Sequence, residues 1–192
     1  MVSITHGRLA KEHRSFFTLH SEVELCAPPA QVFPFFADAR NLDAITPAFL
    51  RFRVLTPGPI QMRVGTRIDY SLRVHGFPIR WTSEITVWEP PECFVDVQIR
   101  GPYRRWHHVH RFEDLGACTR VIDEVEYACP GGRLVHELFV KRDLVRIFEY
   151  RQAVLEKICG FVSRHMAAPR NVEVETKPQE PAVVELWKTI DR

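Results

Sequence analysis

The sequence predicts an α+β domain in which a curved antiparallel sheet of about seven strands wraps around one long C-terminal helix. Six runs of alternating hydrophobicity lie between residues 49 and 127, separated by short turn segments rich in glycine and proline. After Gly131-Gly132, apolar residues recur at helical spacing to about His165. A sheet of this size needs a cover for its apolar face, and only the last helix is long enough to provide it.

One strand and two short helices are expected before the six runs. Residues 16–26 alternate, with Leu19, Val23 and Leu25 on one face, which predicts a half-buried strand. Apolar residues at roughly helical spacing between 30 and 45 then predict one helix and a second short turn that ends at Pro47. The short breaks between the later runs favour antiparallel hairpins, and these runs are 49–55, 64–74, 79–88, 93–99, 103–112 and 119–127.

The long helix is expected to present one broad apolar stripe to the sheet. Lys141-Arg142 interrupts the stripe, so a break or bend is expected there. A strongly twisted sheet that curls around such a helix leaves space between them, which predicts an internal cavity. The stripe consists of Leu134, Leu138, Val145, Phe148, Leu155, Cys159 and Val162.

The length and composition indicate one domain with short appendages. The chain has 192 residues, of which 45% are hydrophobic and 26% charged, and its formal net charge is +2. Nothing in this balance calls for nucleic acid or an anionic membrane as a partner. We expect an N-terminal extension over residues 1–14, a ligand-binding domain over 15–166, and a linker with a short amphipathic tail over 167–192. The tail could contact a second copy of the chain or a partner, and disorder is the alternative.

A cytoplasmic location is expected from three features of the sequence. The first 14 residues lack the apolar core of a signal peptide. No stretch approaches the ~18 uninterrupted apolar residues of a spanning helix. The five cysteines are odd in number, scattered and without a C-x-x-C pair, which favours thiols in a reducing compartment over a disulfide framework.

The run 103–112 carries two histidines on its expected interior face. Alternation groups His108 and His110 with the aromatic residues Trp106 and Phe112. Two histidines at this spacing on a strand can share a metal ion, but no carboxylate or cysteine completes a ligand set by spacing. A hydrogen-bonded pair of interior histidines is the favoured interpretation, and no metal site and no cofactor are predicted.

Two carboxylates could serve these histidines. In the run 93–99, Asp96 and Gln98 share a face, and either that face lines a polar cavity or it meets solvent. If it faces inward, Asp96 or Gln98 could pair with His108 or His110, and such a pair would tune a general base near neutral pH. Asp123 lies on an apolar face of the next run and needs a partner, either Arg151 or one of the histidines. For Asp123, a salt link between strands is favoured over catalysis.

Several other residues are candidates for a ligand-binding wall. Tyr70, Trp81 and Ser83 occupy plausible interior positions, and aromatic walls with a few polar groups suit ring systems as well as an ordinary core. Gln152 lies inside the apolar stripe of the long helix, where a polar side chain needs a partner or a ligand. The sequence shows no nucleophile elbow, phosphate-binding glycine loop or dinucleotide fingerprint.

The order of elements and several segments resemble the SRPBCC superfamily, also called the helix-grip or START-like fold. The resemblance covers about residues 15–164 and is nearest to the bacterial ligand-binding and polyketide cyclase/dehydrase-like branch. The segments that carry it are NLDAITP (41–47), GTRIDY (65–70), WTSEI (81–85), FVDVQIRGPY (94–103), WHHVHRF (106–112) and FEYR (148–151).

The resemblance implies that the domain binds a small hydrophobic molecule, cyclic or lipid-like, as a carrier or sensor. The alternative that it implies is a polyketide cyclase/dehydrase-type enzyme, of the lyase or isomerase kind, with His108, His110 and Asp96 in acid–base roles. The superfamily has no single shared catalytic motif, so the fold alone does not decide between them. The expected ligand-binding residues are Tyr70, Trp81, Ser83, Gln98, Trp106, Phe112, Asp123, Phe148 and Gln152.

Overall fold

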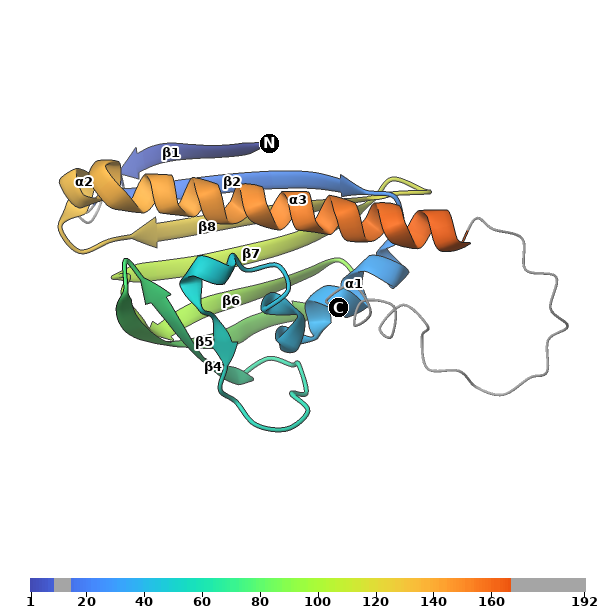
Figure 1. The fold of residues 1–192 in the computed structure, drawn as a ribbon, viewed down its shortest axis with the longest axis horizontal. Coiled ribbons are helices and arrows are strands. Elements are labelled where there is room, and N and C mark those ends of the chain that lie inside the picture. The colour runs from blue at the N-terminus through green and yellow to red at the C-terminus, as the bar shows by residue number, and fades with distance from the viewer. Residues whose placement is uncertain (9–14, 167–192) are drawn as a thin grey trace, which may run out of the picture.

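A curved eight-stranded sheet and one long helix dominate the computed structural model, which describes residues 1–8 and 15–166 (Figure 1). Every strand pairs antiparallel with its neighbours, in the order β1-β2-β8-β7-β6-β5-β4-β3. The strands are β1 (Val2–Arg8), β2 (Ser15–Leu25), β3 (Arg53–Val54), β4 (Arg67–Val74), β5 (Phe77–Glu89), β6 (Cys93–Arg100), β7 (Arg105–Asp114) and β8 (Thr119–Ala128).

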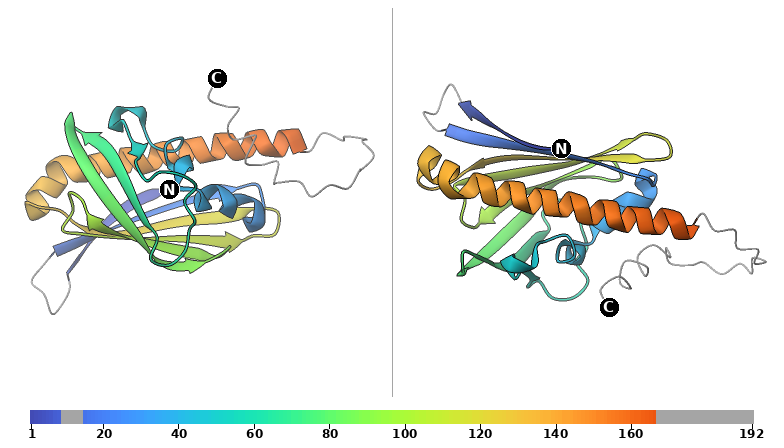
Figure 2. Two further views of the ribbon diagram at one scale, coloured as in Figure 1. Left: turned by 90° about the horizontal axis from the view of Figure 1, so that it is seen from below. Right: turned by 45° about the horizontal axis from the view of Figure 1, so that its top comes forward.

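The helices flank this sheet as the sequence predicts. Two views show the C-terminal helix lying across the concave side of the sheet, with β4 and β5 curling up beside it (Figure 2). The α+β class with a long C-terminal helix is therefore confirmed. The helical elements are α1 (Pro29–Ala37), the 3-10 turns η1 (Ala39–Leu42) and η2 (Ala48–Leu50), α2 (Gly132–Val135), the π-helical turn η3 (His136–Val140) and α3 (Lys141–Met166).

The first strand is an element that the sequence analysis missed. Residues 1–14 were expected to form an extension outside the domain, but Val2–Arg8 pairs with β2 along its whole length. Val2 and Ile4 pack partly buried against the core cluster that contains Phe17 and Phe148. Only two apolar side chains mark the inward face of this edge strand, so the alternation signal is weak.

The start of the long helix also departs from the expected stripe. Leu134 and Leu138 are 71% and 60% exposed, whereas Leu144, Phe148 and Leu155 are buried. The π-helical turn places an extra residue in one turn and rotates everything before it relative to α3. The expected break at Lys141-Arg142 coincides with the end of this turn, where regular α-helix resumes.

One predicted strand is mostly irregular instead. The run 49–55 becomes the turn η2 followed by the two-residue strand β3, with Arg51 in the left-handed region at a φ of 45°. Prolines at 47, 57 and 59 leave little room for a longer strand. None of the helices in the described part of the chain is long and apolar enough to cross a bilayer.

Candidate functional site

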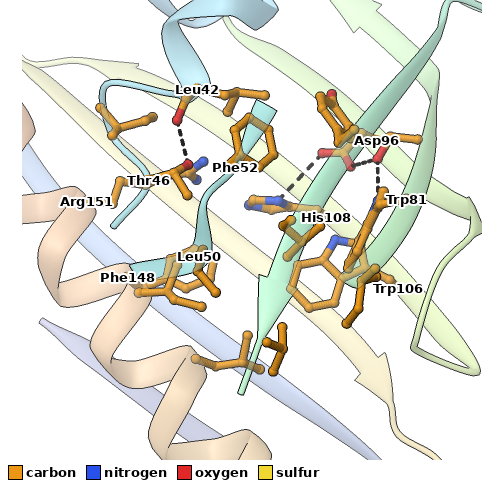
Figure 3. Close-up of a pocket in the computed structure, with 18 of the residues that line it drawn as sticks. Leu42, Thr46, Leu50, Phe52, Trp81, Asp96, Trp106, His108, Phe148 and Arg151 are labelled. Atoms are coloured by element: carbon orange, nitrogen blue, oxygen red, sulfur yellow. Dashed lines mark hydrogen bonds and ion pairs between the residues drawn. The ribbon is translucent and has the colours of Figure 1, made fainter. Parts of the chain in front are cut away.

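A cavity of about 710 Å³ lies between α3, the concave face of the sheet and the segment that carries η1 and η2 (Figure 3). Most of its wall is apolar or aromatic, with side chains from β4, β5, β7 and α3. Phe49, His75 and Gly76 line the cavity and are also exposed, so the cavity reaches the surface beside the β4–β5 turn. At this opening Nε2 of His75 lies 2.8 Å from Oδ2 of Asp143, which joins the turn to α3.

Aromatic rings from three elements form one side of this cavity. Trp81 of β5 and Trp106 of β7 meet edge to face, with ring centroids 5.2 Å apart. Tyr103, in the turn before β7, lies 4.8 Å from Trp106. Rings arranged in this way offer flat apolar surface to a ligand that itself contains rings.

A compact group of ionisable side chains interrupts the apolar wall. The sheet register sets Asp96 of β6 opposite His108 of β7, and His110 of β7 opposite Asp123 of β8. Because all four side chains project to the concave face, each imidazole lies between two carboxylates. Arg151 of α3 contacts these side chains from the helix side of the cavity, with its guanidinium 3.5 Å from the carboxylate of Asp123.

Each carboxylate contacts a different nitrogen of each imidazole ring. Oδ2 of Asp96 lies 3.1 Å from Nε2 of His110 and 3.6 Å from Nδ1 of His108. Oδ1 of Asp123 lies 3.0 Å from Nε2 of His108 and 2.8 Å from Nδ1 of His110. The two rings are 3.7 Å apart between centroids. We call Asp96, His108, His110, Asp123 and Arg151 the polar cluster.

A chain of hydrogen bonds holds Asp96 in place. The indole N–H of Trp81 donates to Oγ of Ser83 over 3.0 Å, and the Ser83 hydroxyl donates to Oδ1 of Asp96 over 3.1 Å. One oxygen of Asp96 is therefore fixed from β5, which leaves the other for the histidines. Such support from neighbouring strands keeps the carboxylate in one orientation.

Burial and charge together set the protonation of the polar cluster. Burial opposes ionisation of Asp123, but Arg151 and the two histidines outweigh it and hold the pKa of this carboxyl well below its usual range. Burial likewise opposes ionisation of Asp96, and its hydrogen bond to His110 and the charges of both histidines lower its pKa. Both carboxylates are thus charged at neutral pH.

The pKa values of the two histidines shift in opposite directions. Burial and the neighbouring His110 lower the pKa of His108 to about 4. Burial also acts against the charged form of His110, but its close contacts with the charged Asp123 and Asp96 raise its pKa above the ordinary value. With His110 protonated, the imidazolium and the Arg151 guanidinium balance the two carboxylates while His108 stays neutral.

The structure brings most of the predicted site residues to the cavity. Asp96 faces inward, which resolves the open choice of face for β6. The predicted residues that line the cavity are Tyr70, Trp81, Ser83, Asp96, Trp106, His108, His110 and Phe148. Asp123 lies behind the histidines, and it contacts both of the partners proposed for it.

Gln98 and Phe112 occupy other places than those expected. Both ends of the Gln98 side-chain amide bond the backbone of Tyr103, donating over 2.7 Å and accepting over 3.3 Å. Gln98 therefore closes the β6–β7 turn and does not line the cavity. Phe112 is buried in the core against Phe33 and Phe36 of α1. Neither side chain is available to a ligand.

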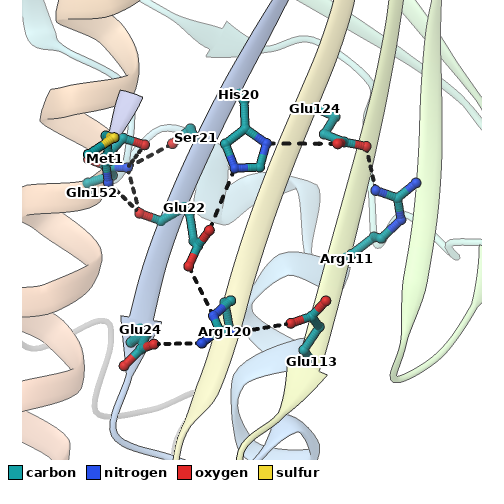
Figure 4. A network of polar contacts seen from close by, with 10 residues as sticks. All are labelled: Met1, His20, Ser21, Glu22, Glu24, Arg111, Glu113, Arg120, Glu124 and Gln152. Carbon is teal, nitrogen blue, oxygen red and sulfur yellow. Dashed lines mark hydrogen bonds and ion pairs between the residues drawn. The ribbon is translucent and has the colours of Figure 1, made fainter. Parts of the chain in front are cut away.

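Gln152 also has a structural partner. Its amide N–H donates to Oγ of Ser21 and to the backbone oxygen of Glu22, both over 2.9 Å, and so ties α3 to β2 (Figure 4). Nearby on β8, Arg120 forms ion pairs with Glu22 and Glu24 of β2 and with Glu113 of β7. The polar residue in the apolar stripe thus anchors the helix and does not reach the cavity.

We expect Gln152→Ala to lower the free energy of unfolding by about 1–3 kcal/mol, because it leaves the buried Ser21 hydroxyl without this donor. Urea denaturation measures the change. Glu156→Ala, at an exposed position of the same helix, is the control and should change stability little. Equal values for the two variants would show that the Gln152 contacts contribute nothing.

Some wall residues escaped the sequence analysis. Leu50, Phe52 and Leu144 line the cavity, as does Tyr103. The first two lie where a strand was expected, and Leu144 lies just past the π-helical turn. The apolar residues between Pro47 and Pro57 were the sequence signal for this part of the wall. Alternation did not show that the segment contains a helical turn.

A protein family and a sequence relative match this chain. The family model described as "Polyketide cyclase / dehydrase and lipid transport" matches residues 25–151. An uncharacterized protein found in two strains of Mycobacterium tuberculosis is 30% identical over 113 residues, which is 57% of this chain and 47% of that protein. The chain thus spans about half the length of these curated relatives.

Solved structures with low sequence identity share the fold. An aromatase/cyclase from Streptomyces sp. R1128 is 18% identical, with a TM-score of 0.58 over 80% of this chain and 97% of that one. A norcoclaurine synthase from Thalictrum flavum is 14% identical, with a TM-score of 0.57 over 85% of this chain and 99% of that one. At these identities the likeness concerns the path of the backbone.

Proposed function

Because the chain belongs to the polyketide cyclase/dehydrase and lipid transport family, we propose that it binds a small apolar molecule, cyclic or lipid-like, in the cavity. The observation that carries the proposal is a cavity of about 710 Å³ with a largely aromatic and aliphatic wall and one polar cluster. Ligand sites in proteins commonly occupy about 300–1,000 Å³ and combine such walls with a few polar groups.

The polar cluster limits the kind of ligand that fits. Its carboxylates are already balanced by charged partners, so a strongly charged ligand would have to displace an internal ion pair. A hydroxyl group on an otherwise apolar ring system could donate a hydrogen bond to Asp96 or to Nδ1 of His108 without that cost. The proposed ligand is therefore mainly apolar, with one or two polar oxygen atoms.

Two measurements test the proposal directly. Purified protein should release a small molecule when native mass spectrometry is followed by denaturation, and the ligand-free protein should take up Nile red with increased fluorescence. A protein that retains nothing and does not bind Nile red would contradict the proposal.

Filling the cavity should abolish this uptake. We expect Ile147→Trp, which places an indole against the cavity wall, to weaken Nile red binding by at least about tenfold, a loss of about 1.4 kcal/mol. Ala153→Trp adds the same side chain at an exposed position of α3 and should leave binding unchanged. Circular dichroism establishes that both variants are folded, and equal binding by both would place the probe elsewhere.

An enzyme of the cyclase or dehydrase kind is the second candidate. It is favoured by the contact of neutral His108 with Asp96 in the cavity wall, since an imidazole beside a carboxylate can accept a proton. The aromatase/cyclase and the synthase among the structural neighbours show that this backbone supports such chemistry in other proteins.

Replacing His108 and His110 with glutamine separates the two candidates. A carrier should still bind the molecule that copurifies with the unmodified protein. An enzyme should bind that molecule but lose its conversion, followed by chromatography of the reaction mixture. Conversion that persists at the original rate in the double variant would remove the two histidines from catalysis.

A further inference from the structure

The polar cluster contains the donor set of a metal site, a feature that the spacing of residues along the sequence does not show. Asp96, His108 and His110 each offer one ligand atom, and these three atoms lie within 4.8 Å of one another. The third ligand that the strand 103–112 lacks on its own comes from the neighbouring strand β6. We propose that these three side chains bind one divalent first-row transition ion, of which Zn²⁺ is the best match.

The distances from Asp96 to the two histidine donors are close to those around a tetrahedral ion. Zn²⁺ lies about 2.0–2.2 Å from nitrogen and oxygen ligands, so that neighbouring ligand atoms are about 3.3–3.6 Å apart. Oδ2 of Asp96 is 3.1 Å from Nε2 of His110 and 3.6 Å from Nδ1 of His108. The donor atoms of the two histidines lie within 4.8 Å of each other, so rotation of the rings would bring all three donors to coordination distance.

The outer nitrogen of His108 has the partner that a metal ligand needs. Metal-bound histidines usually donate their second N–H to a carboxylate or a carbonyl, which fixes the ring and raises its basicity. Nε2 of His108 lies 3.0 Å from Oδ1 of Asp123, and Arg151 in turn holds Asp123. Asp96 is held in the same manner by Ser83 and, through it, by Trp81.

His110 contacts Asp123 through the nitrogen that would not bind the ion. Its Nδ1 is buried and makes no hydrogen bond of acceptable geometry among the described residues, although it lies 2.8 Å from Asp123. Coordination through Nε2 of His110 would release the proton that this nitrogen shares with Asp96, and the N–H at Nδ1 would remain beside Asp123.

Three protein ligands leave the fourth position of the ion open. Asp96, His108 and His110 all line the cavity, so this position faces the space where an organic ligand would lie. Zinc sites that act on substrates have this composition, whereas structural sites use four protein ligands. An ion here would accept water or a ligand oxygen, and it would polarise a bound carbonyl group.

Titration of the chelator-treated full-length chain with Co²⁺ alone tests the site. We expect one equivalent to bind with the visible absorption bands of a four- or five-coordinate ion, and Zn²⁺ to displace it. Thiolate ligands would add an intense near-ultraviolet charge-transfer band, so its absence separates this site from binding at the cysteines. No Co²⁺ binding, or binding with that thiolate band alone, would overturn the proposal.

Substitutions of single residues test which side chains bind the ion. Asp96→Asn and His110→Gln should weaken Co²⁺ binding by at least about 100-fold, and Asp123→Asn by about 10- to 100-fold. His107→Gln, at the neighbouring position of β7 that does not face the cluster, is the matched control and should bind normally. Normal binding by Asp96→Asn and His110→Gln would refute the assignment.

A measurement on the unmodified chain decides the matter where a variant fails to fold. Long-range ¹H–¹⁵N spectra should show Zn²⁺ shifting the imidazole nitrogens of His108 and His110 and leaving those of His107 in place. The reverse pattern would contradict the site. These experiments use no organic ligand, so their failure would leave the proposed binding of an apolar molecule standing, and the Nile red experiment can fail without affecting the metal site.

Discussion

Replacing Asp123 with alanine is expected to lower the free energy of unfolding by about 3–5 kcal/mol, because it leaves the positive charge of Arg151 and that of protonated His110 buried without this partner. The side chain of Asp123 is only 4% exposed and that of His110 only 5%, so water replaces little of the lost interaction. Urea denaturation near pH 6.5 in the presence of a chelator, with the midpoint and slope both fitted, measures the change.

The control for this prediction lies one residue along the same strand. Glu124 projects to the outer face of β8 and pairs with Arg111 and His20, with its side chain 38% exposed. Glu124→Ala should therefore change stability little, because exposed ion pairs contribute weakly. A loss below about 1 kcal/mol in Asp123→Ala would mean that the polar cluster rearranges and the two charges find other partners.

The stability of the metal-free protein is expected to pass through a maximum near pH 6.5. The pKa of His108 is lowered to about 4 in the folded state, so the unfolded chain binds more protons between pH 6.5 and 4 and stability falls as the pH drops through this window. At about 1.4 kcal/mol per pH unit for one proton, the fall amounts to about 3 kcal/mol. His136, whose pKa burial also lowers, contributes in the same direction.

His110 accounts for the expected loss of stability on the alkaline side of the maximum. Its pKa is raised in the folded state by Asp123 and Asp96 against the effect of burial, so its contribution is complete below pH 6.5 and is lost as the pH rises through the folded value. The lowered pKa values of Asp96 and Asp123 add a further loss of stability below their ordinary range.

Urea midpoints measured between pH 3.5 and 9 at fixed ionic strength, on the order of six values spaced by about one unit, would define both limbs. We expect His108→Gln to flatten the acid limb and His110→Gln to flatten the alkaline limb. A curve that rises steadily across the whole range, or variants that leave both slopes unchanged, would contradict the assignment of protons to this pair.

The sequence was informative where one strand face is clearly apolar. On β7, Trp106 and Phe112 mark the inward face, and the two histidines between them follow by alternation. On β6 the odd-numbered residues Val95, Val97 and Ile99 form the more apolar face, yet Phe94 and Asp96 line the cavity. Both faces of this strand carry apolar residues, so alternation alone could not choose between them.

Although separate pairs were proposed from the sequence, the meeting of all five cluster residues could not be predicted from periodicity. It depends on the register of three strands and on the rotation of α3, and neither is local to any segment. The π-helical turn shows the same limit, because one inserted residue turned Leu134 and Leu138 outward although their spacing fits the stripe. Gln152 was marked as a polar residue in need of a partner or a ligand, and Gln98 as a possible partner of the histidines. Gln152 bonds Ser21, and Gln98 bonds the backbone of Tyr103.

The size and the wall of the cavity also determine the thermodynamic signature of filling it. A space of about 710 Å³ corresponds to on the order of 20 water molecules at the volume that each occupies in the liquid. Most of the wall offers these molecules no hydrogen bond, and only the polar cluster can hold a few of them in place. An apolar guest would return the remainder to bulk solvent, so calorimetry at several temperatures should give a binding enthalpy that becomes more negative on heating.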